Sequence, residues 1–408
     1  MKTVDHTDTT TVKVAATSPS PVKICMHLRE VARTDRRVLR EATALLEEGF
    51  AVSIVDVECE QTHPVEEDIS GIHMKHMLKP HWLTPTYNLR RLVRSTEKLI
   101  WSTWTMLQMS ADIYHAHDEN ALLPCYIAAL VHRKPLVFDA HELPLRGLGY
   151  TRWLGLRTLL ALLFTAIMSR CSGVITVSPP IAQEIRSRYR ARRVTVIRNI
   201  PAFQAVAKSD RLRQHLGLGP EIRIALYQGN IDQVRQLSSL VRAAGLLERN
   251  TVIVLMGKGV GETVSELEAL AVKESVADRV KIIPPVPYAE LLEWTASADI
   301  GLAVFSPDYS LSVRWCLPNK LFEYLMAGLP VLATSLDAVA DLLKSYDVGQ
   351  VVPSFTPVDI AAAINAMLAD HAALDRMRRN ALKAVRGDLC WEKERQRLIR
   401  LYRDILSM

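Results

Sequence analysis

A lysine and a glutamate stand three residues apart in the segment CLPNKLFEYLMAGLPVLATS, residues 316–335. The pattern predicts a short helix that ends at Gly328, with Lys320 in its first turn. The helix dipole favours anions at that position rather than cations. Two interpretations follow. Either Lys320 is a solvated lysine with a weak ion pair to Glu323, or a phosphate binds at the helix start and Lys320 adds a point charge. Glu323 would then accept hydrogen bonds from hydroxyls attached to that phosphate.

The same question arises after other predicted strands in the second half of the sequence. IRIALYQG, residues 222–229, is followed by IDQVRQLSSLVRAA, which places Arg235 near a predicted helix start, again against the dipole. The next strand ends in GKGVGE, residues 257–262, whose glycines permit close approach of the backbone to a ligand. This glycine pattern alone is weak, since it is neither a Walker loop nor a dinucleotide fingerprint. We expect five residues to gather at one edge of a sheet: Arg235, Gly257, Gly259, Lys320 and Glu323.

Two predicted strands in the first half end in HAHD, residues 115–118, and DAHE, residues 139–142. Burying such side chains without partners is costly, so both clusters are expected to line a wet cleft. His115, His117 and Asp118 could ligate a metal, but no other metal-binding motif supports this, and we predict no metal site. His141 is the better candidate, as a hydrogen-bond donor or proton handler. The alternative is a histidine that caps the next helix.

Apolar strand-like runs alternate with helical segments through both halves of the sequence, as in RRVLREATALLEEG. This alternation predicts an α/β protein with parallel sheets covered on both faces. The predicted strands of the first half are residues 22–28, 51–57, 112–117, 135–141, 173–178 and 194–199. Those of the second half are residues 222–229, 251–257, 280–286, 300–306, 330–335 and 349–353.

The length of 408 residues fits two domains rather than one. Two doubly wound domains in one chain usually bind a ligand between them, beyond the carboxyl ends of their strands. The predicted divisions are a disordered tail (1–20), a first Rossmann-like domain (21–200), a linker (201–220), a second Rossmann-like domain (221–380) and a C-terminal helix that packs back on the first domain (381–408).

The composition is that of a globular protein, with 49% hydrophobic residues and a net charge of +6, which is too small to predict nucleic-acid binding. The longest apolar run, residues 158–169, is too short to span a bilayer. We therefore expect a cytoplasmic or peripheral protein. Residues 87–107 and 146–170 mix basic side chains with Trp101, Trp104 and an apolar helix. They are core helices with solvated ends, or a patch that contacts an anionic membrane.

With these motifs assembled, the chain resembles a family 4 glycosyltransferase of the GT-B fold, in which two doubly wound Rossmann-like domains face each other across a cleft. The resemblance covers nearly the whole chain after the tail. Its first-domain segments are CMHLREVARTDRRVLREATALLEEGFAVSIV, DIYHAHDENALLPCYIAA, PLVFDAHEL, GVITVSPPIAQEI and VTVIRNIP. In the second domain YQGNIDQVRQLSSLVRAAGLL is similar to the family's first helix, and PNKLFEYLMAGLPVLAT to its signature helix.

The resemblance implies that the protein transfers a sugar from a nucleoside diphosphate sugar to a sugar, lipid-linked or small-molecule acceptor. It implies that the first domain (21–200) lies on the acceptor side and that the second domain (221–380) binds the nucleotide sugar. It implies retention of configuration, no cofactor and no metal. By matched position, Arg235 and Lys320 would hold the diphosphate, Glu323 the ribose hydroxyls, and His141 would lie beside the transferred sugar. The implied nucleotide-sugar contacts are Gly229, Asn230, Gly257, Gly259, Asp308, Leu317, Asn319, Leu321 and Glu323.

Two positions depart from the family pattern. Trp315 stands where the signature usually has a second glutamate, and Asn230 where an arginine commonly follows the first glycine. Contacts to the sugar must then come from backbone near Leu311 to Leu317 or from Asp308. Two other functions stay open: a nucleotide-sugar epimerase of the same fold, which needs acid–base carboxylates in the cleft, and a catalytically silent nucleotide-sugar sensor, which the loss at Trp315 favours.

Overall fold

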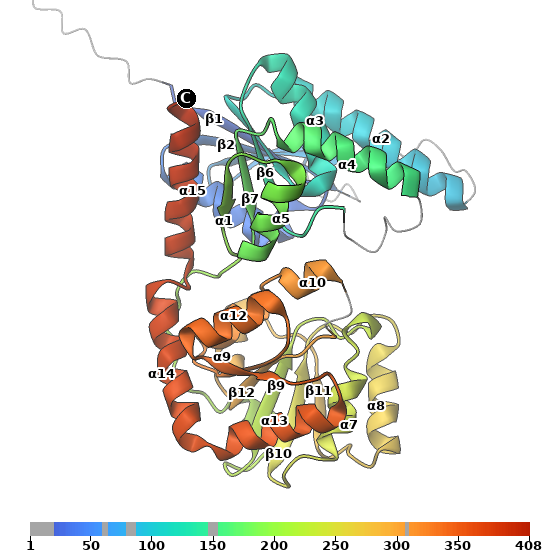
Figure 1. Ribbon diagram of the computed structural model, residues 1–408, viewed down its shortest axis with the longest axis vertical. Helices are drawn as coiled ribbons and strands as arrows, with labels where there is room; N and C mark the ends of the chain where they lie inside the picture. The colour runs from blue at the N-terminus through green and yellow to red at the C-terminus, as the bar shows by residue number, and fades with distance from the viewer. Residues whose placement is uncertain (1–19, 59–63, 79–86, 146–153, 307–309) are drawn as a thin grey trace, which may run out of the picture.

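The computed structural model describes residues 20–58, 64–78, 87–145, 154–306 and 310–408, and it divides into two halves, each built on one sheet (Figure 1). The predicted α/β class with two doubly wound sheets is confirmed. Nearly all of the predicted disordered tail, residues 1–20, lies outside the described residues.

The first half holds an eight-stranded sheet with the order β3-β4-β2-β1-β5-β6-β7-β8. All neighbouring strands are parallel except β3, which is antiparallel to β4. β3 and β4 were not predicted from the sequence, because they form an edge hairpin of short strands with mixed polarity. The bounds are β1 Lys23–His27, β2 Ala51–Glu58, β3 Glu66–Ile69, β4 Ile72–Leu78, β5 Ile113–His117, β6 Leu136–Ala140, β7 Gly173–Thr176 and β8 Val194–Val196.

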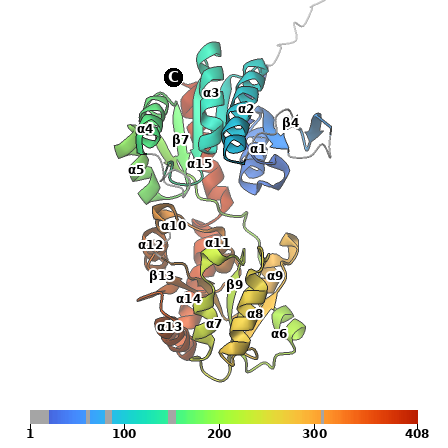
Figure 2. The ribbon, with the colours of Figure 1, turned by 90° about the vertical axis from the view of Figure 1, so that its right-hand side faces the viewer.

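Helices cover both faces of this sheet because its strands are apolar on both sides (Figure 2). One face carries α1 (Arg36–Glu47), which follows the short turn η1 (Ala32–Thr34), together with α15 (Trp391–Leu406) from the end of the chain. The other face carries α2 (Tyr87–Gln108), α3 (Asp118–His132), α4 (Leu154–Met168) and α5 (Pro179–Tyr189). Among the described residues no helix is long and apolar enough to cross a membrane.

The second half holds a six-stranded parallel sheet with the order β11-β10-β9-β12-β13-β14. Its strands are β9 Arg223–Gln228, β10 Thr251–Met256, β11 Val280–Ile283, β12 Ile300–Ala303, β13 Val331–Thr334 and β14 Gly349–Val352. One face packs on α7 (Ser238–Ala244), α8 (Thr263–Lys273) and α13 (Pro357–Ala369). The other packs on α6 (Arg211–Leu216), α9 (Leu291–Thr295), α11 (Asn319–Met326), α12 (Asp337–Tyr346) and α14 (His371–Gly387).

The chain crosses between the halves twice, after β8 and between α14 and α15. The two crossings touch: the Trp391 backbone N–H donates to the Pro201 carbonyl at 3.2 Å. Beside them, buried Arg198 donates from Nε to Glu394 Oε1 at 2.7 Å. The range predicted as a linker, 201–220, includes helix α6, which packs on the second half because Leu212 is buried there. α14 likewise continues past the boundary placed at residue 380.

Candidate active site between the two halves

A cavity of about 780 Å³ lies between the two halves. It brings together eight of the residues predicted for the site: His141, Gly229, Asn230, Arg235, Gly257, Asn319, Lys320 and Glu323. Three other predicted residues are not in its wall. The side chains of Leu317 and Leu321 belong to the hydrophobic core under α11, and Gly259 lies beyond the wall. Asp308 lies outside the described residues.

Lys320 lies in the first turn of α11, as predicted, and lines the cavity. Its Nζ is 3.6 Å from the centre of the Tyr227 ring and 4.9 Å from that of Phe305. It forms no ion pair with any residue that the structure describes. Burial lowers the pKa of Lys320 well below its usual value, and the nearby Arg235 lowers it further. Lys320 is therefore a half-buried amine without an ion-pair partner among the described residues, in a cavity large enough to hold an anion.

Arg235 is the second cation in the wall of this cavity. It lies in the turn η3 (Gln233–Arg235), before α7, so the helix predicted to begin beside it begins later. Asp232 caps this turn by accepting a hydrogen bond from the Arg235 backbone N–H at 2.9 Å. The Arg235 guanidinium lies 5.3 Å from the centre of the Phe305 ring, so both cations lie beside the same aromatic ring. The two cations therefore converge on one part of the cavity.

Two glycine loops bring backbone close to these cations. Gly229 has a φ of +127°, which side chains rarely adopt, and a Cβ there would lie 3.2 Å from Lys320 Nζ. A Cβ on Gly257 would lie only 1.8 Å from the Gly229 carbonyl oxygen, so the two loops can run side by side only if residue 257 is glycine. Gly259 pairs with Ile231 in an isolated bridge that continues this contact.

Glu323 follows Lys320 by one turn of α11 and faces the same cavity. Its carboxylate accepts a hydrogen bond of 2.5 Å from the Gln228 side chain amide. Burial raises the pKa of Glu323, and the hydrogen bond from Gln228 and the charge of Lys320 oppose this shift. A second carboxylate oxygen is left to accept hydrogen bonds from a ligand, which is what vicinal hydroxyls require.

His141 enters the cavity from the first half, just after β6. Its ring is held between two carboxylates: Nδ1 is 3.2 Å from Asp118 Oδ2, and Nε2 is 3.1 Å from Asp139 Oδ2. Burial alone would lower the pKa of His141, but Asp139 and Asp118 raise it to about 9. Both ring nitrogens therefore carry protons at neutral pH and donate them to carboxylates. This geometry favours a fixed positive charge in the cavity wall over the proton handler that the sequence suggested as one possibility.

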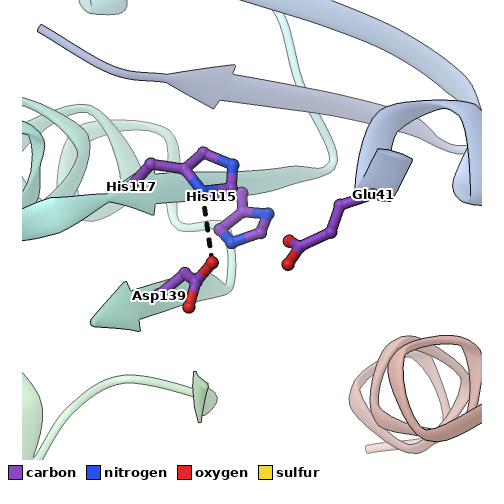
Figure 3. Close-up of side chains that lie close together, drawn as sticks. All are labelled: Glu41, His115, His117 and Asp139. Carbon is purple, nitrogen blue, oxygen red and sulfur yellow. Dashed lines mark ion pairs between the residues drawn. The ribbon is translucent and has the colours of Figure 1, made fainter. Parts of the chain in front are cut away.

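A buried cluster lies behind His141, and Figure 3 shows four of its side chains, from α1, β5 and β6, facing one another. The ligand atoms of Glu41, His115, His117 and Asp139 lie within 4.8 Å of one another and could in geometry hold a metal ion. Arg37, however, already supplies a cation there. Its Nε donates to Asp139 Oδ2 at 2.7 Å and its Nη2 to Asp139 Oδ1 at 2.9 Å.

Arg37 holds Asp139 in place behind the cavity wall. It was not predicted from the sequence. Burial disfavours its charge, but Asp139 and Glu41, whose Oε1 lies 3.2 Å from Arg37 Nε, raise its pKa overall. In return, although burial opposes it, Arg37 and His141 hold the pKa of Asp139 well below its usual value. The only hint in the sequence is the spacing of Arg37 and Glu41 by four residues, which fits any helix surface.

Trp315 lies in α10 (Leu311–Trp315) and does not line the cavity. Its Nε1 donates to Asp337 Oδ2 at 3.0 Å, and its ring packs against the hydrophobic core of the first half. In the same helix the Ser312 hydroxyl accepts a hydrogen bond from the Leu143 backbone N–H at 3.2 Å. The tryptophan that replaces the family's glutamate thus joins the two halves.

Comparison with known proteins assigns both halves. Residues 34–200 match the family profile described as Glycosyltransferase Family 4, and residues 208–384 match Glycosyl transferases group 1. A D-inositol 3-phosphate glycosyltransferase of Thermomonospora curvata is 26% identical over 204 residues, which are 48% of this chain and 46% of that protein. Its counterpart in Nocardia farcinica is 29% identical, over 52% of this chain and 43% of that protein. The chain thus spans about half the length of these relatives.

Solved structures match over almost the full length. Sucrose-phosphate synthase from Thermosynechococcus elongatus superposes with a TM-score of 0.76 at 17% identity, over 95% of this chain and 99% of that one. HepE of Anabaena, solved in complex with UDP, gives 0.71 at 15% identity, over 95% and 100% of the two chains. These likenesses show the fold, and the two family profiles together span most of the chain. The chain belongs to the family 4 glycosyltransferases and has the GT-B fold.

Proposed function

We propose that this protein transfers a sugar from a nucleoside diphosphate sugar to an acceptor hydroxyl, with retention of configuration at the anomeric carbon and without a metal ion. The observation that carries the proposal is the half-buried Lys320, which has no ion pair with a described residue and lies next to Arg235 and two glycine loops in one cavity. Glu323, one turn beyond, suits the ribose hydroxyls. We place the reaction in the biosynthesis of a polysaccharide, glycolipid or glycoconjugate.

The proposed chemistry follows from where the charges lie. When the bond between the anomeric carbon and the diphosphate oxygen breaks, its electron pair leaves with the oxygen and negative charge grows there. Lys320 and Arg235 stabilise that charge, which makes a metal dispensable. The acceptor hydroxyl bonds to the anomeric carbon on the face that the diphosphate leaves, and its proton passes to the leaving oxygen. His141 adds a fixed positive charge at the cavity wall.

A nucleotide panel tests the proposal. We expect one of UDP, GDP, dTDP and ADP to stabilise the chain against thermal unfolding, by about 2.7 kcal/mol at 100 times its dissociation constant. The matching nucleotide sugar should then be hydrolysed slowly in EDTA, with NMR showing the released sugar first in its original anomeric form. Release of the inverted anomer would contradict retention. Conversion to a second nucleotide sugar would indicate an epimerase, and tight binding without any turnover would indicate a sensor.

Nucleotide binding should also take up protons, because the pKa of Lys320 is lowered in the free protein and a diphosphate beside it raises that pKa. Between the two pKa values the complex binds more protons than the free chain, so affinity falls as pH rises through the pKa of the complex. Calorimetry in buffers of different ionisation enthalpy measures this uptake. A binding enthalpy independent of the buffer would contradict the lowered pKa.

We also propose that the first half contacts an anionic membrane surface, which would suit a lipid-linked acceptor. On α2 the side chains of Trp101 and Trp104 are 45% and 54% exposed, and on α4 Leu159 and Leu162 are 63% and 65% exposed. The basic residues Arg90, Arg91, Arg94, Arg146, Arg152 and Arg157 lie outside the described side chains. Co-sedimentation with anionic vesicles should be lost in Trp101→Ala/Trp104→Ala, and equal binding to neutral vesicles would contradict the proposal.

A further inference from the structure

Three arginines on α1 face the gap between the halves. They differ in whether a carboxylate pairs with them. Arg37 forms ion pairs with Asp139 at 2.7 Å and with Glu41 at 3.2 Å. Arg36 and Arg40 form no ion pair with any residue in the part of the chain that the structure describes. Instead, the Arg36 guanidinium lies 3.1 Å from the centre of the Tyr288 ring, and Arg40 donates to the Asn199 side chain. These contacts orient both guanidiniums without cancelling their charge.

The two unpaired arginines line a second cavity, of about 420 Å³. Burial lowers the pKa of Arg40, and the positive charges of Arg37 and Arg36 add to this, while Tyr288 and Glu41 oppose it. Three carboxylates also line this cavity, but none pairs with either arginine. Asp35 caps α1, and Glu30 is exposed. Glu323 accepts a hydrogen bond from Gln228; burial raises its pKa, and the charges of Arg36 and Arg40 are among those that oppose the shift, although neither arginine forms an ion pair with it. An excess of positive charge in a cavity wall attracts an anionic ligand.

The second cavity is continuous with the first one. The residues that line both are Arg36, His141, Tyr288, Asn319 and Glu323. Lys320 and Arg235 line only the first cavity. An anion held by Arg36 and Arg40 is therefore a different group from the diphosphate at Lys320, yet it lies next to the place where His141 meets the transferred sugar.

We propose that Arg36 and Arg40 form a subsite for a phosphomonoester on the acceptor. This inference rests on the proposed function, since it describes that reaction's second substrate. Two guanidiniums without counter-ions match the charge of a phosphomonoester dianion better than that of a carboxylate, and guanidinium forks bind phosphate oxygens in pairs. The acceptor class is then a phosphorylated sugar or polyol, whose free hydroxyl reaches the donor sugar from the first half.

Binding of a sugar phosphate to the nucleotide-loaded protein tests this inference. Saturating UDP, or the diphosphate found by the panel, fills the site at Lys320, and glucose 6-phosphate, glucose and glucuronate are then titrated calorimetrically. We expect glucose 6-phosphate to bind at least tenfold more tightly than the other two. Arg36→Ala should weaken it about tenfold or more, Arg36→Lys less, and each should change the affinity for UDP by less than about threefold.

Arg36 is the informative position because it is exposed and makes no hydrogen bond with a described residue, so the substitution spares the fold. Arg395→Ala, on the surface of α15, is the matched control and should change neither affinity. Equal affinity for glucose and glucose 6-phosphate would overturn the subsite, and so would an equal loss of UDP and glucose 6-phosphate affinity in Arg36→Ala.

Failure of the phosphate subsite can be told apart from failure of the proposed transferase function. If no nucleoside diphosphate binds the wild-type chain, the transferase proposal fails. The subsite is then tested without nucleotide in a Lys320→Ala background, which removes the lysine of the first cavity as a competing site for phosphate. Binding of glucose 6-phosphate that still depends on Arg36 supports the subsite, and binding that is indifferent to Arg36 overturns it.

Discussion

Replacing Lys320 with alanine is expected to lower kcat for donor turnover by about 10²–10³-fold, the usual loss when one positioned charge-stabilising group is removed. Lys320 is held over the Tyr227 ring beside Arg235, at the point where the leaving diphosphate would gather charge. Binding of the nucleoside diphosphate should weaken as well, because the ground-state diphosphate carries charge already. Steady-state kinetics with the nucleotide sugar measures the first effect and calorimetry the second.

The same substitution should not destabilise the free protein. Lys320 is a cation that burial disfavours and that no described anion pairs with, so its removal relieves a cost. We expect the unfolding temperature of the unliganded variant to equal or exceed that of the wild type, while its shift with nucleotide disappears. Lys273→Ala, an exposed lysine at the end of α8, is the control and should alter neither quantity. A kcat within threefold of wild type in Lys320→Ala would refute the assigned role.

Replacing Arg37 with alanine is expected to lower the free energy of unfolding by about 3–5 kcal/mol, because it leaves a buried carboxylate without its partner. Asp139 is wholly buried and takes two hydrogen bonds from Arg37, and Glu41 loses its nearest cation. Urea unfolding monitored by circular dichroism gives the difference in stability. Activity should fall too, because Asp139 would no longer be fixed to hold His141.

The loss of unfolding free energy in Arg37→Ala should be smaller at low pH. The pKa of Asp139 is lowered in the folded chain, so the pair stabilises the protein above the unfolded-state pKa of about 4 and loses this effect as pH falls through the folded pKa. The gap between wild type and Arg37→Ala should therefore narrow in acid. Arg395→Ala breaks a surface pair between α15 and Glu47 at the end of α1, the helix that carries Arg37, and should cost under about 1 kcal/mol. A similarly small cost for Arg37→Ala would contradict the account.

The sequence predicted those parts of the site that local patterns determine. Lys320 and Glu323 share one face of a short helix, and that spacing is legible without any tertiary information. Gly229 and Gly257 follow strands, where the edge of a parallel sheet gathers residues from distant segments. The alternation of strands and helices likewise predicted both sheets apart from the edge strands β3 and β4, because the central strands are buried on two faces and read as apolar runs.

The remaining features depend on contacts between distant segments. Arg37 and Asp139 are 102 residues apart in the chain, and a single sequence does not pair a charge on one helix with a carboxylate at a strand end. Leu317 and Leu321 match the signature helix, but their side chains turn into the core, because a helix laid on a sheet must bury one stripe. Trp315 contacts the opposite half through α10, a contact that only the assembled fold reveals.

The position of α15 in the chain also determines when the first half can finish folding during synthesis. Leu398, Tyr402 and Ile405 cover a face of the first sheet, yet they are made after the entire second half, since β8 ends at Val196 and α15 begins at Trp391. While the ribosome translates the intervening residues, the apolar surface that α15 later covers stays exposed on the first half. Exposed faces of this kind are what chaperones bind on nascent chains. The half that leaves the ribosome first is therefore the last to be finished.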